Sequence, residues 1–308
     1  MRIVSLLPSA TEILFALGIE DQLVGRTHAC DYPVEVASVP LVTRTVVPGA
    51  LAGRPMDAVL RHAHHAGTDG YALDGDALRG ARPDLVLTQD ACDACGLSRR
   101  GVLAALGSSD REVEVVALAP TSVEGILNTI TTIGAMTSAE DEAIGLVEIL
   151  RERLGRIEEQ VLRRRSEGAR PRRVVALEWL DPPFASGLWV PEQVRRAGGW
   201  DLLGREGERA AGTTWRAVLD VDPEQLLLMP CGWDARRTAD AWASFEQPEG
   251  WDLPAVRRGD VFALDAASYF TRPGPRVIEG IALLAQLFDP RGFVEEGPAD
   301  AWIPLGAR

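Results

Sequence analysis

The chain has 308 residues, enough for one large domain or for two lobes of about 130 to 150 residues each. Its formal net charge of −13 argues against nucleic acid or an anionic membrane surface as the main partner. Its basic residues are all arginine, and the absence of lysine excludes a Walker A phosphate loop and a Schiff-base enzyme. The longest apolar runs, such as Leu226–Met229, are far shorter than the roughly 20 residues that span a bilayer, so we expect no membrane insertion.

The first residues predict a strand, a tight turn and a helix. A short apolar run at 2–6 is typical of a buried strand, and it ends at Pro8. Ser9 and Glu12 have the spacing of a capping box, in front of an apolar run that stops at Gly18. In an open α/β sheet, ligands bind where strands end and such helices begin. Because a strand that starts at residue 2 leaves no room for a leader peptide, we expect a cytoplasmic protein.

Strand and helix signals alternate along the rest of the chain, which predicts mainly parallel sheets. The expected strands lie near 2–6, 22–27, 84–88, 113–118, 173–178, 225–229 and 260–264, and the expected helices near 122–134 and 275–288. The two halves resemble each other locally, since 83–88 and 223–229 both start with proline and both end at a loop that carries cysteine. The sequence therefore predicts two similar lobes.

A long helix is expected between the lobes, over about 138–167. Its apolar residues recur at steps of three and four and form one stripe: Ala143, Val147, Leu150, Leu154, Ile157 and Val161. The alternative is the helix of a coiled-coil dimer, for which the repeat is short. We therefore predict an α/β fold of two Rossmann-like lobes with mainly parallel sheets, joined by one long α-helix. The predicted boundaries are 1–135 for the N-terminal lobe, 136–168 for the connecting helix and 169–308 for the C-terminal lobe.

Polar, thiol and aromatic residues gather directly after five predicted strands, where a two-lobed α/β protein has its cleft. In or near these loops are His28, Cys30, Asp31, Tyr32, Gln89, Cys92, Cys95, Trp179, Trp189, Trp215, Cys231, Trp233, Tyr269 and Arg272. A core tryptophan normally lies inside an element, whereas a tryptophan on a binding loop provides a flat wall for a large planar ligand. We favour the wall for these tryptophans. Ser9 and Thr11 on the first helix are expected to point into the same cleft.

Cys92 and Cys95 form a CxxC pair. Thiolates at this spacing bind Zn²⁺ or iron, and Cys30, Cys231 or His28 would complete the site. The same spacing also suits a redox disulfide, particularly where a helix N-terminus lowers the pKa of one thiol. Structural thiols are the third interpretation, because four scattered cysteines are unremarkable at this length. The three interpretations stay open at this point.

Several ordered segments resemble the cobalamin-binding proteins of ABC importers. They are Leu-Pro-Ser-Ala-Thr-Glu at 7–12, Cys-Asp-Tyr-Pro at 30–33, Pro-Asp-Leu-Val at 83–86, Pro-Pro-Phe-Ala-Ser-Gly at 182–187 and Arg-Pro-Gly-Pro-Arg at 272–276. The resemblance runs from residue 2 to about residue 288. It implies a substrate-binding protein whose two lobes are joined by one long helix and move little. By position, it implies that Tyr32, Trp179, Trp215 and Tyr269 line the ligand, and that Gln89 lies where the family often has tryptophan.

The resemblance implies non-enzymatic binding of a corrinoid such as cobalamin, or of a related metal chelate, in the cleft between the lobes. His28 or a thiol would serve as axial ligand, and an ABC permease would be the partner only if the chain is exported. The sequence departs from exported relatives in lacking a leader or lipoprotein cysteine and in carrying its four cysteines. The alternative is therefore a cytosolic thiol protein that binds zinc, iron or a cluster, with a trafficking or redox role. No catalytic triad order, carboxylate pair or dinucleotide fingerprint indicates an enzyme.

Overall fold

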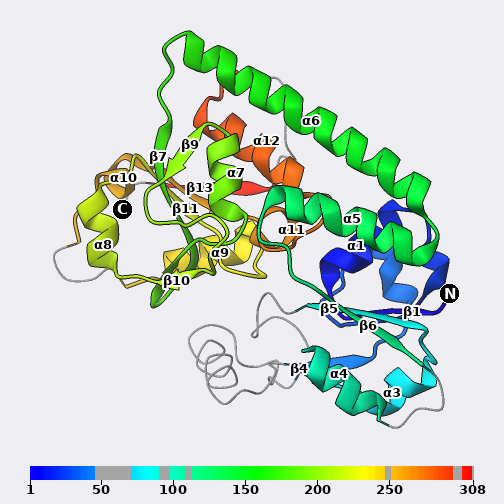
Figure 1. Ribbon diagram of the computed structural model, residues 1–308. Helices are drawn as coiled ribbons and strands as arrows, with labels where there is room; N and C mark the ends of the chain where they lie inside the picture. Colours follow the sequence, from blue (N-terminus) through cyan, green and yellow to red (C-terminus); the bar gives the residue numbers. More distant parts are fainter. Residues whose placement is uncertain (46–70, 90–97, 108–111, 247–250, 294–299, 307–308) are drawn as a thin grey trace. The chain divides into compact units, whose positions relative to one another are not determined.

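The computed structural model describes residues 1–45, 71–89, 98–107, 112–246, 251–293 and 300–306. The chain forms two compact units. Unit 1 contains Met1–Pro120 and Ile126–Val147, and unit 2 contains Thr121–Gly125 and Glu148–Arg308. Both units are α/β, as predicted, with strands that alternate with helices along the chain (Figure 1). No described helix is both long enough and apolar enough to cross a bilayer.

Unit 1 contains a parallel sheet in the order β2-β1-β5-β6. Its strands are β1 (Ile3–Ser5), β2 (Leu23–Arg26), β5 (Leu85–Gln89) and β6 (Glu114–Leu118), and a separate antiparallel pair is formed by β3 (Thr43–Thr45) and β4 (Tyr71–Leu73). The central strands β1 and β5 are buried along their whole length, which is why the sequence reads as continuous apolar runs there. The four strands predicted in this half are confirmed.

The helices of unit 1 cover this sheet. They are α1 (Pro8–Ala16), the 3₁₀ turns η1 (Glu20–Gln22) and η2 (Val34–Ser38), α3 (Gly75–Gly80), α4 (Arg99–Leu106) and most of α5 (Val123–Thr137). One apolar cluster joins strand residues Val4 and Val86 to Leu78, Val102 and Leu106 of α3 and α4. Burial of these side chains at roughly 25 cal/mol per Å² of apolar surface fixes the two helices on the sheet.

The capping prediction for the first helix is wrong. Helix α1 begins at Pro8, and its N-cap Leu7 is extended and provides no side-chain hydrogen bond. Proline is favoured at a first helical position because it has no N–H to satisfy and its φ is preset. Ser9 therefore lies inside the first turn. Helix α5 is capped by Ser122, whose Oγ accepts the N–H of Gly125 at 3.0 Å.

Unit 2 is built on the sheet β10-β8-β7-β11-β12-β13, with β9 paired to β7. The strands are β7 (Arg172–Leu180), β8 (Pro183–Ala185), β9 (Gly199–Asp201), β10 (Ala211–Gly212), β11 (Gln225–Leu228), β12 (Val261–Leu264) and β13 (Trp302–Leu305). Strands β7, β11 and β12 are parallel neighbours, as predicted, whereas β8, β10 and β13 add antiparallel pairs. The antiparallel strands are short, and nothing in the periodicity of the sequence predicted them.

The helices of unit 2 are α7 (Val190–Arg196), α8 (Trp215–Val221), α9 (Ala235–Ala243), α10 (Pro254–Arg258), α11 (Ala266–Tyr269) and α12 (Val277–Phe288). The closing helix predicted at 275–288 is thus confirmed. The core cluster under these helices contains Val175 and Leu177 of β7, Leu226 and Leu228 of β11, and Trp242 of α9. This buried β7-β11 pair places the carboxyl ends of the two strands at one edge of the sheet.

Helix α6 (Glu140–Ser166) is the predicted long helix, and it is a single unbroken rod in Figure 1. All six residues of the predicted apolar stripe are buried, each at most 8% exposed. Acidic residues occupy its first turn and Arg163, Arg164 and Arg165 its last turn, which suits the helix dipole. Within unit 2, two ion pairs fix α6 to α12. Arg153 pairs with Glu279 in α12 at 3.5 Å, and Arg164 pairs with Asp289 at the C-terminal end of α12 at 2.6 Å. The α/β fold of two lobes with one long helix is confirmed.

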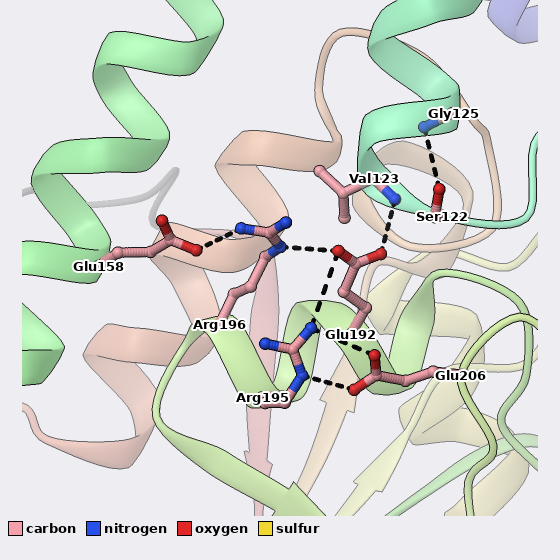
Figure 2. A network of polar contacts seen from close by, with 8 residues as sticks. All are labelled: Ser122, Val123, Gly125, Glu158, Glu192, Arg195, Arg196 and Glu206. Carbon is pink, nitrogen blue, oxygen red and sulfur yellow. Dashed lines mark hydrogen bonds and ion pairs between the residues drawn. The ribbon is translucent and has the colours of Figure 1, made fainter.

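An ion-pair network on α7 fixes the first turn of α5 within unit 2 (Figure 2). The Glu192 carboxylate accepts hydrogen bonds from the N–H of Val123 and from Nε of Arg196, each at 2.8 Å. Arg196 also contacts Glu158 of α6. Because the Glu192 side chain is only 9% exposed, its charge is little screened by water, and the network stabilises the turn more than a surface pair would. A buried carboxylate thus performs the role of an N-terminal cap from another helix.

Candidate functional site

Three loops at the carboxyl ends of β7, β11 and β12 are tied together in unit 2. The N–H of Cys231 donates to the carbonyl of Glu178 at 3.1 Å. The N–H of Ala267 donates to the carbonyl of Trp233 at 3.0 Å, and the N–H of Gly232 donates to Thr271 Oγ1 at 3.3 Å. Three of the five predicted strand-end clusters are therefore contiguous. In an open α/β sheet this edge is the usual ligand-binding position.

Aromatic rings and a guanidinium group form one surface at this edge of the sheet. The rings of Trp179 and Trp233 are partly exposed, with centroids 5.2 Å apart and planes inclined at 61°. The guanidinium carbon of Arg237 lies 4.3 Å from the Trp233 ring centroid, within cation–π range. Arg237 is held in the first turn of α9, where its N–H donates to the cap Asp234 at 2.7 Å. The surface thus offers flat apolar area together with positive charge.

Tyr269 and Arg272 follow β12 on the same side of unit 2. The Tyr269 side chain is largely buried, and burial, aided by the charge of Glu279, raises the pKa of its phenol, which therefore stays protonated at neutral pH. The Arg276 guanidinium lies 5.7 Å from the Tyr269 ring centroid. Arg272 is half-buried in the loop between α11 and α12. This segment adds a hydrogen-bond donor and two guanidinium groups to the site.

Two other tryptophans predicted as ligand walls serve the interior of unit 2. Trp189 is 4% exposed, and its indole N–H donates to the carbonyl of Phe270 at 2.6 Å, so the prediction of a ligand wall is wrong for Trp189. Trp215 begins α8 and packs in an aromatic cluster, with centroids 5.0 Å from those of Phe245 and Trp251. Trp215 itself is partly exposed. From the sequence, Trp189 and Trp215 could not be distinguished from Trp179, because all three lie in or near a predicted loop.

In unit 1, the loop after β2 is fixed by the guanidinium of Arg26. Its Nε donates to the carbonyl of Val39 and its Nη1 to the carbonyl of Cys30, both at 3.0 Å. Asp31 and Tyr32 are exposed on this loop, and Tyr32 shows 49% of its surface to solvent. Gln89 ends β5 and is largely buried. The exposed tyrosine is the principal contact surface that this loop offers.

Ser9, Thr11 and Cys30 lie in the interior of unit 1. Thr11 has no exposed surface, and its Oγ1 lies 2.9 Å from Ser5 Oγ and 3.0 Å from Cys30 Sγ. Ser9 and Cys30 are each 1% exposed. The expectation that Ser9 and Thr11 point into a cleft is therefore wrong, and the helix starts two residues earlier than a capping box at Ser9 requires. The Thr11 hydroxyl ties α1 to the loop after β2.

His28 is half-buried beside two threonine hydroxyls. Its Nδ1 lies 3.2 Å from Thr43 Oγ1 and 3.4 Å from Thr27 Oγ1. Burial, and then the charge of Arg26, lower the pKa of His28 below its usual value of 6.5. The imidazole is therefore neutral at pH 7, which is the form that ligates a metal.

The cysteines do not form a metal site among the residues that the structure describes. Nowhere in the described ranges do three or more His, Cys, Asp or Glu side chains form a group that could hold a metal ion. Cys30 and Cys231 lie in different units, one buried and one partly exposed. Cys92 and Cys95 lie outside the described residues. The four-cysteine metal site stays a prediction.

Sequence reasoning missed a buried carboxylate behind the site. Ser186 Oγ donates to Asp201 Oδ2 at 2.6 Å, while the N–H groups of Leu203 and Gly204 donate to Oδ1 at 3.2 and 3.0 Å. Burial raises the pKa of the Asp201 carboxyl, and these hydrogen bonds oppose the rise. A Cβ on Gly204 would lie 2.3 Å from Asp201 Oδ2, so the turn requires glycine. The signal in the sequence, an aspartate three residues before a glycine, is too common to identify such a site.

The fold and the strand-end site define a substrate-binding protein. A family model described as periplasmic binding protein matches residues 3–267. The chain therefore belongs to the periplasmic binding protein family. Members of this family bind a substrate for an ABC transporter and are not enzymes.

Similar proteins are known from several bacteria. The chain is 26% identical over 306 residues to an uncharacterized ABC transporter substrate-binding lipoprotein, YvrC, of Bacillus subtilis, with 96% of this chain and 82% of that protein covered. It is similar in fold to a periplasmic heme-binding protein from Pseudomonas aeruginosa, with a TM-score of 0.73, 19% identity, and coverage of 100% and 98% of the two chains. It is also similar to the periplasmic vitamin B12-binding protein BtuF of Vibrio cholerae, with a TM-score of 0.66, 19% identity, and coverage of 94% and 96%.

The expectation of a cytoplasmic protein is wrong. The family is one of periplasmic binding proteins, and the curated relative is a lipoprotein. Both classes of protein act outside the cytoplasm. The start of the fold near residue 2 was a poor guide to location, because it records only where a strand begins.

Proposed function

We propose that this protein binds a planar metal chelate of the corrinoid or porphyrin class, with a corrinoid such as cobalamin as the first candidate, and presents it to an ABC permease. The observation that carries the proposal is the Trp179–Trp233 pair with Arg237 beside it, at the carboxyl edge of the parallel strands of unit 2. Corrins and porphyrins are large, flat and apolar, with polar or acidic groups around the ring. Stacked aromatic side chains suit the ring, and guanidinium groups suit the periphery.

Each contact is assigned by the exposure and chemistry of its side chain. Trp179 and Trp233 contact the macrocycle, one with its face and the other with its edge because their planes are inclined at 61°, while Arg237 and Arg272 bind its peripheral groups. Tyr269 donates a hydrogen bond through its phenol, which is protonated at neutral pH.

In unit 1, the candidate ligand contacts lie at the ends of its strands. They are the exposed Tyr32 and Asp31 in the loop after β2, and the largely buried Gln89 at the end of β5. His28 is the axial ligand of the chelated metal, since its lowered pKa keeps the imidazole neutral.

The similar proteins support this ligand class without selecting one member of it. One is a heme-binding protein and another a vitamin B12-binding protein, and both have the fold of this chain. The relative of Bacillus subtilis supports the transporter role, because its name describes an ABC transporter substrate-binding protein.

The test is a side-by-side titration of the full chain with aquocobalamin and hemin, followed by tryptophan quenching and by the visible spectrum. We expect saturable binding of at least one probe at micromolar concentration. Trp179→Ala should weaken it by about tenfold or more, since loss of a stacked aromatic costs roughly 1.4 kcal/mol or above. The matched control is Trp200→Ala, because Trp200 is 60% exposed on β9 and has no assigned contact. Absence of binding of both probes at micromolar concentration would overturn the proposal.

A second variant tests the axial ligand. His28→Ala should abolish the visible band shift that accompanies coordination of the metal, while tryptophan quenching by the macrocycle persists. Loss of quenching and band shift together would show that His28 supports the loop and is not a ligand.

A further inference from the structure

Trp189 at the N-cap of α7 and Gln193 inside this helix donate hydrogen bonds to the backbone of the segment that carries Tyr269 and Arg272. The indole N–H of Trp189 donates to the carbonyl of Phe270 at 2.6 Å. The amide Nε2 of Gln193 donates to the carbonyl of Tyr269 at 3.0 Å and to that of Val277 at 2.9 Å. These donors thus fix three carbonyls of the segment 269–277, two at its start and one at its end.

The two donors act from one face of α7. Trp189 and Gln193 are four residues apart, and the backbone N–H of Gln193 donates to the carbonyl of Trp189 at 2.9 Å, so their side chains lie one turn apart. Gln193 has no exposed surface and Trp189 almost none. Water therefore does not compete for these three hydrogen bonds.

The contact is tight as well as buried. A Cβ on Gly280 of α12 would lie 2.5 Å from the carbonyl oxygen of Tyr269 and 2.7 Å from Nε2 of Gln193. Glycine in a helix interior is unfavourable, and here it makes room for the bridging amide. Helices α7, α11 and α12 therefore meet around the Gln193 side chain.

Stability alone does not explain a glutamine at this position. Its Oε1 is buried and has no hydrogen-bond partner in the structure. An unsatisfied buried acceptor is unfavourable, and an apolar residue of similar volume would avoid it. What the amide adds is the fixed position of the carbonyls of Tyr269 and Val277, at the two ends of the loop.

We infer that Trp189 and Gln193 are positioning residues that preorganise the 269–277 segment for ligand binding. This inference rests on the proposed function, in which Tyr269 and Arg272 contact the ligand. A segment already held in its binding geometry loses less conformational entropy when the ligand binds, so affinity is higher. Neither positioning residue touches the ligand.

The test uses Gln193→Leu and, as a more conservative variant, Trp189→Phe, which removes the indole N–H and keeps an aromatic ring. Three quantities are measured on the full chain: hydrogen exchange of the amides at 270–276 without ligand, the affinity for aquocobalamin and hemin, and the urea midpoint from tryptophan fluorescence. Gln22→Leu is the matched control, because Gln22 of unit 1 also has a buried Oε1 without a partner.

We expect both positioning variants to exchange at 270–276 about tenfold faster and to bind the probe about tenfold more weakly, with a urea midpoint close to wild type for Gln193→Leu. The control Gln22→Leu should change neither the exchange rate at 270–276 nor the affinity for the probe. Unchanged exchange in both variants would overturn the inference, and so would faster exchange with unchanged affinity. If the wild type binds neither probe, the proposed function fails, and the exchange measurement still decides whether these side chains fix the segment.

Discussion

Replacement of Glu192 by alanine provides the sharpest test of the network in Figure 2. Glu192 accepts one hydrogen bond from the N–H of Val123 and one from Arg196, each at 2.8 Å, and its side chain is almost fully buried. Alanine removes both acceptors at once. It leaves the N–H of Val123 in the first turn of α5 without this acceptor, and it leaves Arg196 with Glu158 as its remaining carboxylate in this network.

The expected loss of stability follows from these contacts. A hydrogen bond to a charged group contributes about 1.5–3 kcal/mol, and a buried N–H left without an acceptor costs about 1–3 kcal/mol. Because the two effects overlap in the N–H of Val123, we expect Glu192→Ala to destabilise unit 2 by roughly 2–4 kcal/mol in total. Glu192→Gln keeps an acceptor for Val123 but loses the charge, and should cost about half as much.

The assay is urea unfolding at 25 °C followed by tryptophan fluorescence. All eight tryptophans belong to unit 2, so the signal reports that unit alone. The matched control is Glu206→Ala, which removes an exposed ion pair with Arg195 and should cost below about 1 kcal/mol. If Glu192→Ala and Glu206→Ala change the free energy of unfolding by the same amount, the capping role of Glu192 is refuted.

Two further predictions concern the pH dependence of unit 1 and the packing of unit 2. Because the folded-state pKa of His28 is lowered, its stabilising contribution is complete above the unfolded-state value of about 6.5 and is lost as pH falls through the folded-state value. Wild type should therefore lose more stability than His28→Asn between pH 7.5 and 5.5, measured by circular dichroism, and equal losses would contradict the burial of the imidazole. Gly280→Ala should destabilise unit 2 by about 1–3 kcal/mol through its clash with the Tyr269 carbonyl, whereas Gly155→Ala in α6, where a Cβ meets nothing within 4 Å, should stabilise it by a few tenths to about 1 kcal/mol. Equal effects of the two alanines in the tryptophan-monitored urea assay would contradict the tight contact at Gly280.

Much of the fold could be predicted because it depends on local periodicity. The α6 stripe repeats at the helical period, and every residue in it is buried. The central strands are continuous apolar runs because parallel strands are covered on both faces. The short strands β8, β10 and β13 were missed, since two to four residues contain too little periodicity to detect.

The candidate site was predicted in outline but not in detail. The loops that carry Trp179, Trp233 and Tyr269 were expected to gather at strand ends, and hydrogen bonds between those loops join them in unit 2. The prediction for Ser9 failed because one proline moved the start of α1. The Ser186–Asp201 pair was not anticipated, because its partners come from separate turns of the chain.

The sequence by itself determined the main parallel strands, the long helix α6 and the closing helix α12, since backbone geometry imposes periods of two and 3.6 on any buried face. It also determined that aromatic and polar residues follow the strands. Only the tertiary structure decided which tryptophan faces outward. Trp179 lies near the end of β7 and Trp189 comes after β8, yet Trp189 turns inward because its indole N–H reaches the carbonyl of Phe270, 81 residues further along the chain. A contact across that separation leaves no periodic signal, because it depends on where two distant segments meet in the folded chain.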